Sequence, residues 1–103
     1  MRKKQYKRNY KSKKYRAWKK VIYQRDSYIC KMRGKSKLHV SAHHIYTWSK
    51  YPDFRYKFWN SVTLCIECHS KTFRHESEFE SLFFNLLEQS LVKRINEIYH
   101  IKR

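Results

Sequence analysis

Acidic residues are scarce in this sequence, and their scarcity is the first constraint on function. Aspartate and glutamate total 8 of 103 residues, whereas lysine and arginine total 25, which gives a formal net charge of +17. Because so many like charges repel one another in a folded domain, the imbalance indicates a polyanionic partner. Nucleic acid is the simplest such partner, since duplex DNA carries a negative charge about every 1.7 Å of its axis.

Long apolar runs are also missing. No run approaches the roughly 18 apolar residues of a membrane-spanning helix, and residues 1–14 lack the apolar centre of a secretory signal. The chain has 3 cysteines, and an odd number without an export signal argues against a disulfide framework. We therefore expect one cytoplasmic domain with no membrane partner, whose thiols are available to bind a metal.

The basic residues gather at the N-terminus. Residues 1–25 contain 12 lysines and arginines and no acid. We expect a mobile basic arm over residues 1–14, since it lacks aliphatic residues that could fold it. Trp18, Val21 and Ile22 form the apolar stripe of a short helix over residues 15–25. The expected nucleic-acid contacts are Arg2, Lys3, Lys4, Lys7, Arg8, Lys11, Lys13, Lys14, Arg16, Lys19 and Lys20.

The remaining chain reads as one small domain, over residues 15–99. The only glycine, Gly34, predicts a tight turn, and alternation through Leu38, Val40 and Ala42 predicts a strand that runs into His43. A loop over residues 46–59 precedes a second strand over residues 61–64, and a helix follows from Cys65. A C-terminal helix is expected over residues 77–98, with Ser77 and Glu80 as a capping box and an apolar face larger than one small core can cover.

Three histidines and an asparagine are the first candidates for a chemical site. His43 and His44 are adjacent at the end of a predicted strand, so their side chains should point in opposite directions. Asn60 follows sixteen residues after His44, and His69 nine residues after Asn60. Two strands and a helix would bring the three histidines together, so that one can hold a metal while another faces a substrate.

The cysteines are the second candidates. Cys65 and Cys68 have the spacing of half a zinc site, and Cys30 offers a third thiolate. A second Cys-x-x-Cys pair, starting at Cys30, would need a cysteine at position 33. That position holds Arg33, and arginine cannot ligate zinc. Two interpretations therefore stay open: a structural zinc ion completed by a histidine, or metal-free packing of small buried thiols. The histidines considered for this place are His39 and His75.

In combination, these residues resemble the HNH endonuclease family, and in particular its small phage-encoded members. The resemblance covers about two-thirds of the chain, from Tyr15 to about Phe79. The matching pieces are Trp18, Val21, Arg25-Asp26, Tyr28 and Cys30; Ala42-His43-His44-Ile45; Trp48-Ser49-Lys50-Tyr51-Pro52 and Arg55; and Asn60-Ser61-Val62-Thr63-Leu64-Cys65-Ile66-Glu67-Cys68-His69.

The resemblance implies an α+β fold with a small ββα-metal (His-Me finger) core, preceded by the basic arm and helix and followed by the amphipathic helix. It also implies metal-dependent hydrolysis of DNA. By position, His43 and His69 would bind one divalent ion, His44 would be the general base, and Asn60 would brace the loop and orient that base. Phe73 stands where some members have a further histidine, so two protein ligands are expected.

The chemistry of phosphodiester hydrolysis fits these roles. A neutral histidine can accept the proton of water, and a divalent ion can neutralise the charge that develops on phosphate. Magnesium is a candidate, but two imidazoles favour manganese, nickel or zinc. Arg55 can bind a phosphate with two parallel hydrogen bonds. The interpretation that it is an ordinary surface arginine without a function is equally compatible with the sequence.

Other functions remain open at this point. A non-enzymatic basic zinc-knuckle protein that binds DNA or RNA fits the charge and the cysteines, and an RNA-binding protein associated with ribosomes fits the basic arm. Neither explains the histidines and Asn60. The sequence does not distinguish nicking from double-strand cleavage, or a monomer from a homodimer. The expected location is the cytoplasm, which is the host cytoplasm if the chain is phage-encoded. Homing, phage DNA packaging and degradation of host DNA are all compatible with the sequence.

Overall fold

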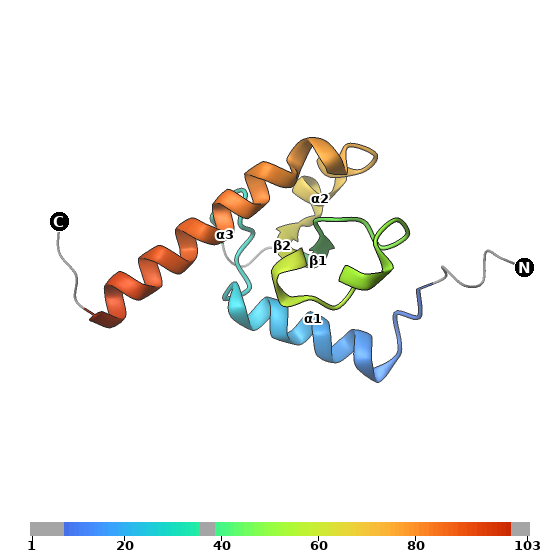
Figure 1. The fold of residues 1–103 in the computed structure, drawn as a ribbon, viewed down its shortest axis with the longest axis horizontal. Helices are drawn as coiled ribbons and strands as arrows, with labels where there is room; N and C mark the ends of the chain where they lie inside the picture. The colour runs from blue at the N-terminus through green and yellow to red at the C-terminus, as the bar shows by residue number, and fades with distance from the viewer. Residues whose placement is uncertain (1–7, 36–38, 100–103) are drawn as a thin grey trace, which may run out of the picture.

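The computed structural model describes residues 8–35 and 39–99. Within these residues, three α-helices surround one two-stranded antiparallel sheet, so the expected α+β class is confirmed (Figure 1). The elements in chain order are α1 (Lys13–Arg25), β1 (Val40–His44), the 3-10 turns η2 (Pro52–Phe54) and η3 (Phe58–Asn60), β2 (Ser61–Cys65), α2 (Ile66–Thr72) and α3 (Glu76–Tyr99).

Helix α1 begins two residues earlier than the sequence pattern predicts. The Ser12 side chain caps it by accepting a hydrogen bond of 3.1 Å from the Tyr15 backbone amide, so the last two residues of the expected arm are helical. The buried stripe consists of Tyr15, Trp18 and Ile22. The expectation that Val21 belongs to it is wrong, because Val21 lies about 100° around the helix from Ile22 and is 47% exposed.

The sheet pairs β1 with β2 so that its two faces carry different residues. His43 lies opposite Val62, whereas His44 lies opposite Ser61. Since successive side chains of a strand point to opposite faces, the two histidines are directed to different sides of the sheet. Helix α1 covers the side of His44, and α2 and α3 lie on the other side (Figure 1).

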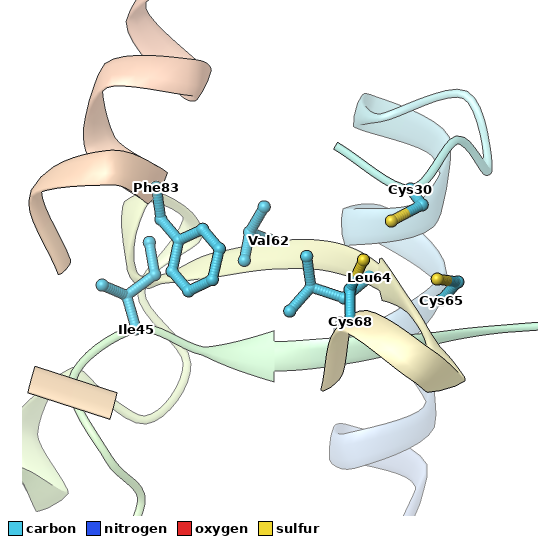
Figure 2. Close-up of a cluster of buried hydrophobic side chains, with 7 residues drawn as sticks. All are labelled: Cys30, Ile45, Val62, Leu64, Cys65, Cys68 and Phe83. Atoms are coloured by element: carbon cyan, nitrogen blue, oxygen red, sulfur yellow. The ribbon is translucent and has the colours of Figure 1, made fainter. Parts of the chain in front are cut away.

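Two buried clusters, one on each side of the sheet, make up the core. The first joins Tyr15, Trp18 and Ile22 of α1 to Ala42 and Trp48. The second is drawn in Figure 2 and consists of Cys30, Ile45, Val62, Leu64, Cys65, Cys68 and Phe83. Full burial of an aromatic side chain such as Phe83 stabilises a fold by about 1.5–3 kcal/mol, so Phe83 helps to attach α3 to the sheet, together with Phe79, Phe84, Leu86 and Leu87.

Helix α3 begins and ends differently from the sequence expectation. It starts at Glu76, so Ser77 is already inside the helix and the predicted capping box is wrong. His75 precedes the helix instead, and its ring nitrogen Nδ1 lies 3.0 Å from the Glu78 carboxylate. The prediction of excess apolar surface is confirmed, because side chains beyond the core contact remain exposed: Leu91, Val92, Ile95 and Ile98.

Part of the predicted basic arm lies outside the described residues, namely Arg2, Lys3, Lys4 and Lys7, as does Leu38 of the predicted strand. No helix in the described part of the chain is long and apolar enough to cross a lipid bilayer.

Candidate functional site

His43 and His69 meet on the side of the sheet that faces α2 and α3. Their rings lie 5.3 Å apart, centre to centre, and are nearly perpendicular at 84°. The His43 ring also packs edge-on against Phe83 at 5.3 Å. Its Nε2 atom is buried and has no hydrogen-bond partner among the described residues. Such an atom is costly to bury, by about 1–3 kcal/mol, unless a ligand such as a metal ion completes its environment.

Burial keeps both of these histidines neutral. It lowers the pKa of His43 to about 3, with smaller contributions from the neighbouring His69, His44 and Arg8. Burial also lowers the pKa of His69, and the charge of Arg8 acts in the same direction. Because only neutral imidazole ligates metals, the two rings are in the protonation state that a metal site requires at neutral pH.

His44 lies on the opposite side of the sheet, between two tryptophans. Its ring stacks on Trp18 at 4.4 Å and 15° and meets Trp48 edge-on at 5.4 Å. The Nε2 atom lies 2.8 Å from the backbone carbonyl of Arg55. A carbonyl can only accept, so Nε2–H donates and Nδ1 carries the free electron pair. Burial lowers the pKa of His44 to about 4, against the opposing effect of the Arg55 carbonyl.

Asn60 is fully buried, and its side chain joins two parts of the loop between the strands. Its Oδ1 accepts a 2.7 Å hydrogen bond from the Tyr46 amide, and its Nδ2 donates to the carbonyls of Tyr46 and Phe54 at 3.0 and 3.1 Å. The side chain therefore holds the start and the middle of the loop together. Since that loop carries Arg55, whose carbonyl holds His44, Asn60 acts on the candidate base through the loop.

Two arginines stack on Trp48 beside the histidines. The guanidinium carbon of Arg8 lies 4.7 Å from the Trp48 ring centre, and that of Arg55 lies 4.4 Å from it. Arg55 Nε donates to the Trp48 carbonyl at 2.8 Å. One nitrogen of each arginine, Arg8 Nε and Arg55 Nη2, is buried without a hydrogen-bond partner among the described residues. This corner of the molecule thus has donors directed at no acceptor.

A cavity of about 430 Å³ adjoins Trp48. Three basic side chains line it, together with one acidic side chain and the Thr47 hydroxyl, which is buried without a hydrogen-bond partner. The basic residues are Arg8, Lys50 and Arg74, and the acidic one is Glu76. The excess of positive charge suits a phosphate group.

The other predicted nucleic-acid contacts lie on or near α1. Lys11, Lys13, Lys14, Arg16 and Lys20 are exposed, and Lys19 is half-buried. The Lys14 ammonium lies 4.4 Å from the Tyr56 ring centre, next to the aromatic group around His44. Helix α1 thus presents an exposed basic surface, while its apolar side holds the sheet.

The three cysteines form a cluster at the other end of the strands. Their sulfur atoms all lie within 4.8 Å of one another, and all three side chains are buried. They come from the loop after α1, the end of β2 and the first turn of α2, and their sulfurs face a common space (Figure 2). Such a cluster can supply three ligands to a metal ion.

No fourth ligand joins this cluster among the described residues. The expectation that His39 or His75 completes it is therefore not met: both side chains are exposed and neither joins the cluster. The nearby charged group is Arg33, whose pKa is raised by the Cys65 thiol and the Glu67 carboxylate and whose Nη1 donates to Glu67. Burial raises the pKa of Cys65, but its hydrogen bonds to Cys68, Cys30 and Arg33 together lower it.

Sequence reasoning missed the tryptophans as partners of His44. Trp18 was read as part of a helix stripe and Trp48 as part of a loop, because ring stacking between distant segments leaves no local pattern. In comparisons with family models, with curated proteins and with solved structures, nothing matches this chain.

Proposed function

We propose that this chain is a metal-dependent endonuclease of the HNH type that hydrolyses DNA phosphodiester bonds. The observation that carries the proposal is the His43–His69 pair, in which two neutral rings meet edge to face and a buried His43 nitrogen has no partner among the described residues. The neighbouring His44 supplies a separate neutral imidazole. A purely structural knuckle needs neither feature.

A divalent metal ion fits this pair. His43 and His69 would hold it, and ligation would give the buried His43 Nε2 the partner it lacks. When bound, such an ion neutralises charge on the phosphate and activates water. Two nitrogen ligands favour manganese, nickel or zinc over magnesium. With two protein ligands, positions remain for substrate and water.

His44 would serve as the general base. The Arg55 carbonyl fixes the tautomer with the proton on Nε2, which leaves Nδ1 free to take a proton from the attacking water. The contacts with Trp18 and Trp48 hold the ring in one orientation. Its lowered pKa keeps the imidazole unprotonated, and therefore able to act as a base, at neutral pH.

Arg55 and Arg8 would bind the phosphates on either side of the cleaved bond. Each presents, next to Trp48, a buried nitrogen that has no hydrogen-bond partner in residues 8–35 and 39–99. A hydrogen bond from a guanidinium to phosphate is charge-assisted and about twice as strong as a neutral one. The exposed lysines of α1 would extend the contact along the duplex.

Nicking of supercoiled plasmid DNA tests this function. We expect cleavage with Mn²⁺ that EDTA abolishes and added metal restores, and we expect His43→Ala and His69→Ala to remove it. The matched controls are His39→Ala and His75→Ala, which alter exposed histidines away from the pair. Cleavage that persists in EDTA, or in both variants of the pair, contradicts the proposal.

A second candidate, a nucleic-acid-binding protein without enzymatic activity, is favoured by the cysteine cluster and by the basic surface of α1. The protein samples of the nicking assay also distinguish the endonuclease from this second candidate. DNA or RNA retarded in a gel by a protein that never nicks the plasmid, with any of the four metals tested (Mg²⁺, Mn²⁺, Ni²⁺ or Zn²⁺), would support the second candidate.

A further inference from the structure

Arg33 occupies the sequence position at which a matching cysteine would supply the fourth ligand of the cluster. Cys30 and Arg33 are separated by two residues, as Cys65 and Cys68 are, and two cysteine pairs with that spacing make a tetrahedral zinc site. We propose that in this chain the Arg33 guanidinium takes the place of both the fourth ligand and the metal, so that the three cysteines form a closed, metal-free cluster.

The contacts of Arg33 support this substitution. The Cys65 thiol and the Glu67 carboxylate both raise the pKa of Arg33, and Arg33 Nη1 donates to the Glu67 carboxylate, two residues beyond Cys65. The side chain, which is 38% exposed, is thereby held beside the first turn of α2. A guanidinium is permanently charged, so it supplies positive charge beside sulfur, as a metal ion would. A zinc ion among the same sulfurs would lie close to this cation and be repelled by it.

The turn that carries Cys30 is closed by its own backbone. The Cys30 amide donates to the Lys35 carbonyl at 3.1 Å, and the Gly34 amide donates to the Cys30 carbonyl at 2.7 Å. Gly34 has a φ of +68°, a conformation that glycine adopts without strain. A further bond of 2.9 Å from the Lys31 amide to the Thr63 carbonyl ties the turn to β2. Many small zinc domains need the metal for this closure, whereas here hydrogen bonds provide it.

The cluster is also continuous with the apolar core. Cys30, Cys65 and Cys68 are 0%, 4% and 2% exposed, and they belong to the same buried cluster as Leu64 and Phe83 (Figure 2). Thiols behave there as small hydrophobic groups. Packing thus contributes the stability that a structural zinc ion supplies elsewhere.

The test is to restore the missing ligand. Arg33→Cys provides a fourth thiol at the matching position, and we expect it to gain zinc on its cysteines, about one ion per chain. Cobalt(II) distinguishes this site from the histidine pair, because thiolate ligands give a strong near-ultraviolet charge-transfer absorption and imidazoles do not. The unaltered chain should show no such absorption when titrated with cobalt under reducing conditions.

Two further variants serve as controls. Arg33→Lys keeps a cation but not the forked donors and should remain without thiolate-bound cobalt. Adding Cys65→Ser to Arg33→Cys should abolish the absorption. Stoichiometric thiolate-bound cobalt in the unaltered chain, lost in Cys65→Ser, would overturn the proposal, and this measurement decides the matter even if Arg33→Cys does not fold. None of these readouts involves cleavage, so they stand apart from the proposed nuclease function.

Discussion

The two ends of the β1–β2 pair hold two clusters that differ in how completely their polar atoms are satisfied. At the histidine end, His43 Nε2, Arg55 Nη2 and Arg8 Nε are buried without partners in the described part of the chain. At the cysteine end, Arg33 is engaged by both Cys65 and Glu67. Both ends are built on the same two strands.

The difference indicates that the histidine end and the cysteine end have different roles, one in binding and one in stability. Buried polar atoms without partners are few in folded proteins and call for an explanation, and binding of an outside group is the one we propose for the histidine end. The cysteine cluster, in the metal-free form that we propose, contributes stability instead. Substitutions at the histidine end should therefore change chemistry more than folding, and substitutions at the cysteine end should do the reverse.

The largest effect should come from His44→Ala. Loss of a general base costs about 10²–10⁴ in rate, while binding of DNA, which depends on lysine and arginine, should change little. Single-turnover nicking and gel retardation measure the two separately. His75→Ala is the control, since that ring contacts only the exposed Glu78 side chain in the contacts described above. Equal nicking by His44→Ala and the unaltered protein would remove the proposed base.

Asn60→Ala should show whether Asn60 acts by positioning the loop that holds His44 or by contacting the substrate. It deletes three partly buried hydrogen bonds, and at about 0.5–1.5 kcal/mol each we expect a loss of about 1.5–4.5 kcal/mol in the free energy of unfolding. Urea denaturation measures that loss, and the maximal nicking rate should fall with it. Asn85→Ala on the exposed side of α3 is the matched control and should leave stability nearly unchanged. A variant that folds normally but cannot cleave would instead place Asn60 in direct contact with substrate.

Arg55→Lys should produce a smaller loss at the histidine end. Lysine keeps the charge but not the forked donors. Hydrogen bonds to charged groups contribute about 1.5–3 kcal/mol, so kcat/KM should fall about 10- to 100-fold. Lys57→Ala, an exposed lysine in the same loop, serves as the control. If Arg55→Lys retains the activity of the unaltered protein, Arg55 acts only as one more positive charge.

The smallest effect on the chemistry should follow removal of residues 1–7. The truncation stops at residue 7, because deleting the whole expected arm, residues 1–14, would also remove Arg8 and the Ser12 cap of α1. Residues 1–7 carry four basic side chains. If all four contact phosphates, the slope of log affinity against log salt should fall by about 3–4 units, with the maximal cleavage rate unchanged.

An unchanged slope would contradict this expectation for the arm. The affinity would then reside in the loop around Lys50, Arg55 and Lys57, and the arm would be a solvated tail. A lower slope combined with a slower maximal rate would show that residues 1–7 also act at the histidine end.

Local patterns in the sequence determined the elements and the direction of neighbouring side chains. The alternation before His43 predicted β1 and the opposite orientation of His43 and His44, because a strand repeats every two residues. The spacing of Trp18 and Ile22 predicted α1 for the same kind of reason, since a helix repeats every 3.6 residues. The closeness of His43 and His69 was also expected, but from the order of the motifs and the resemblance rather than from spacing alone.

Only the tertiary structure decided what each of these side chains meets. The two tryptophans around His44 come from α1 and from the loop, thirty residues apart in the chain. His75 was a candidate for the cysteine cluster by type, yet the fold places it before α3, beside Glu78. The sequence shows that Arg33 replaces a cysteine of the zinc-ligand pattern. Its proximity to Cys65 and Glu67, however, depends on how the turn that carries Cys30 packs against α2. Residue type and periodicity act over a few neighbouring residues, whereas a site is assembled by packing between segments that the sequence keeps far apart.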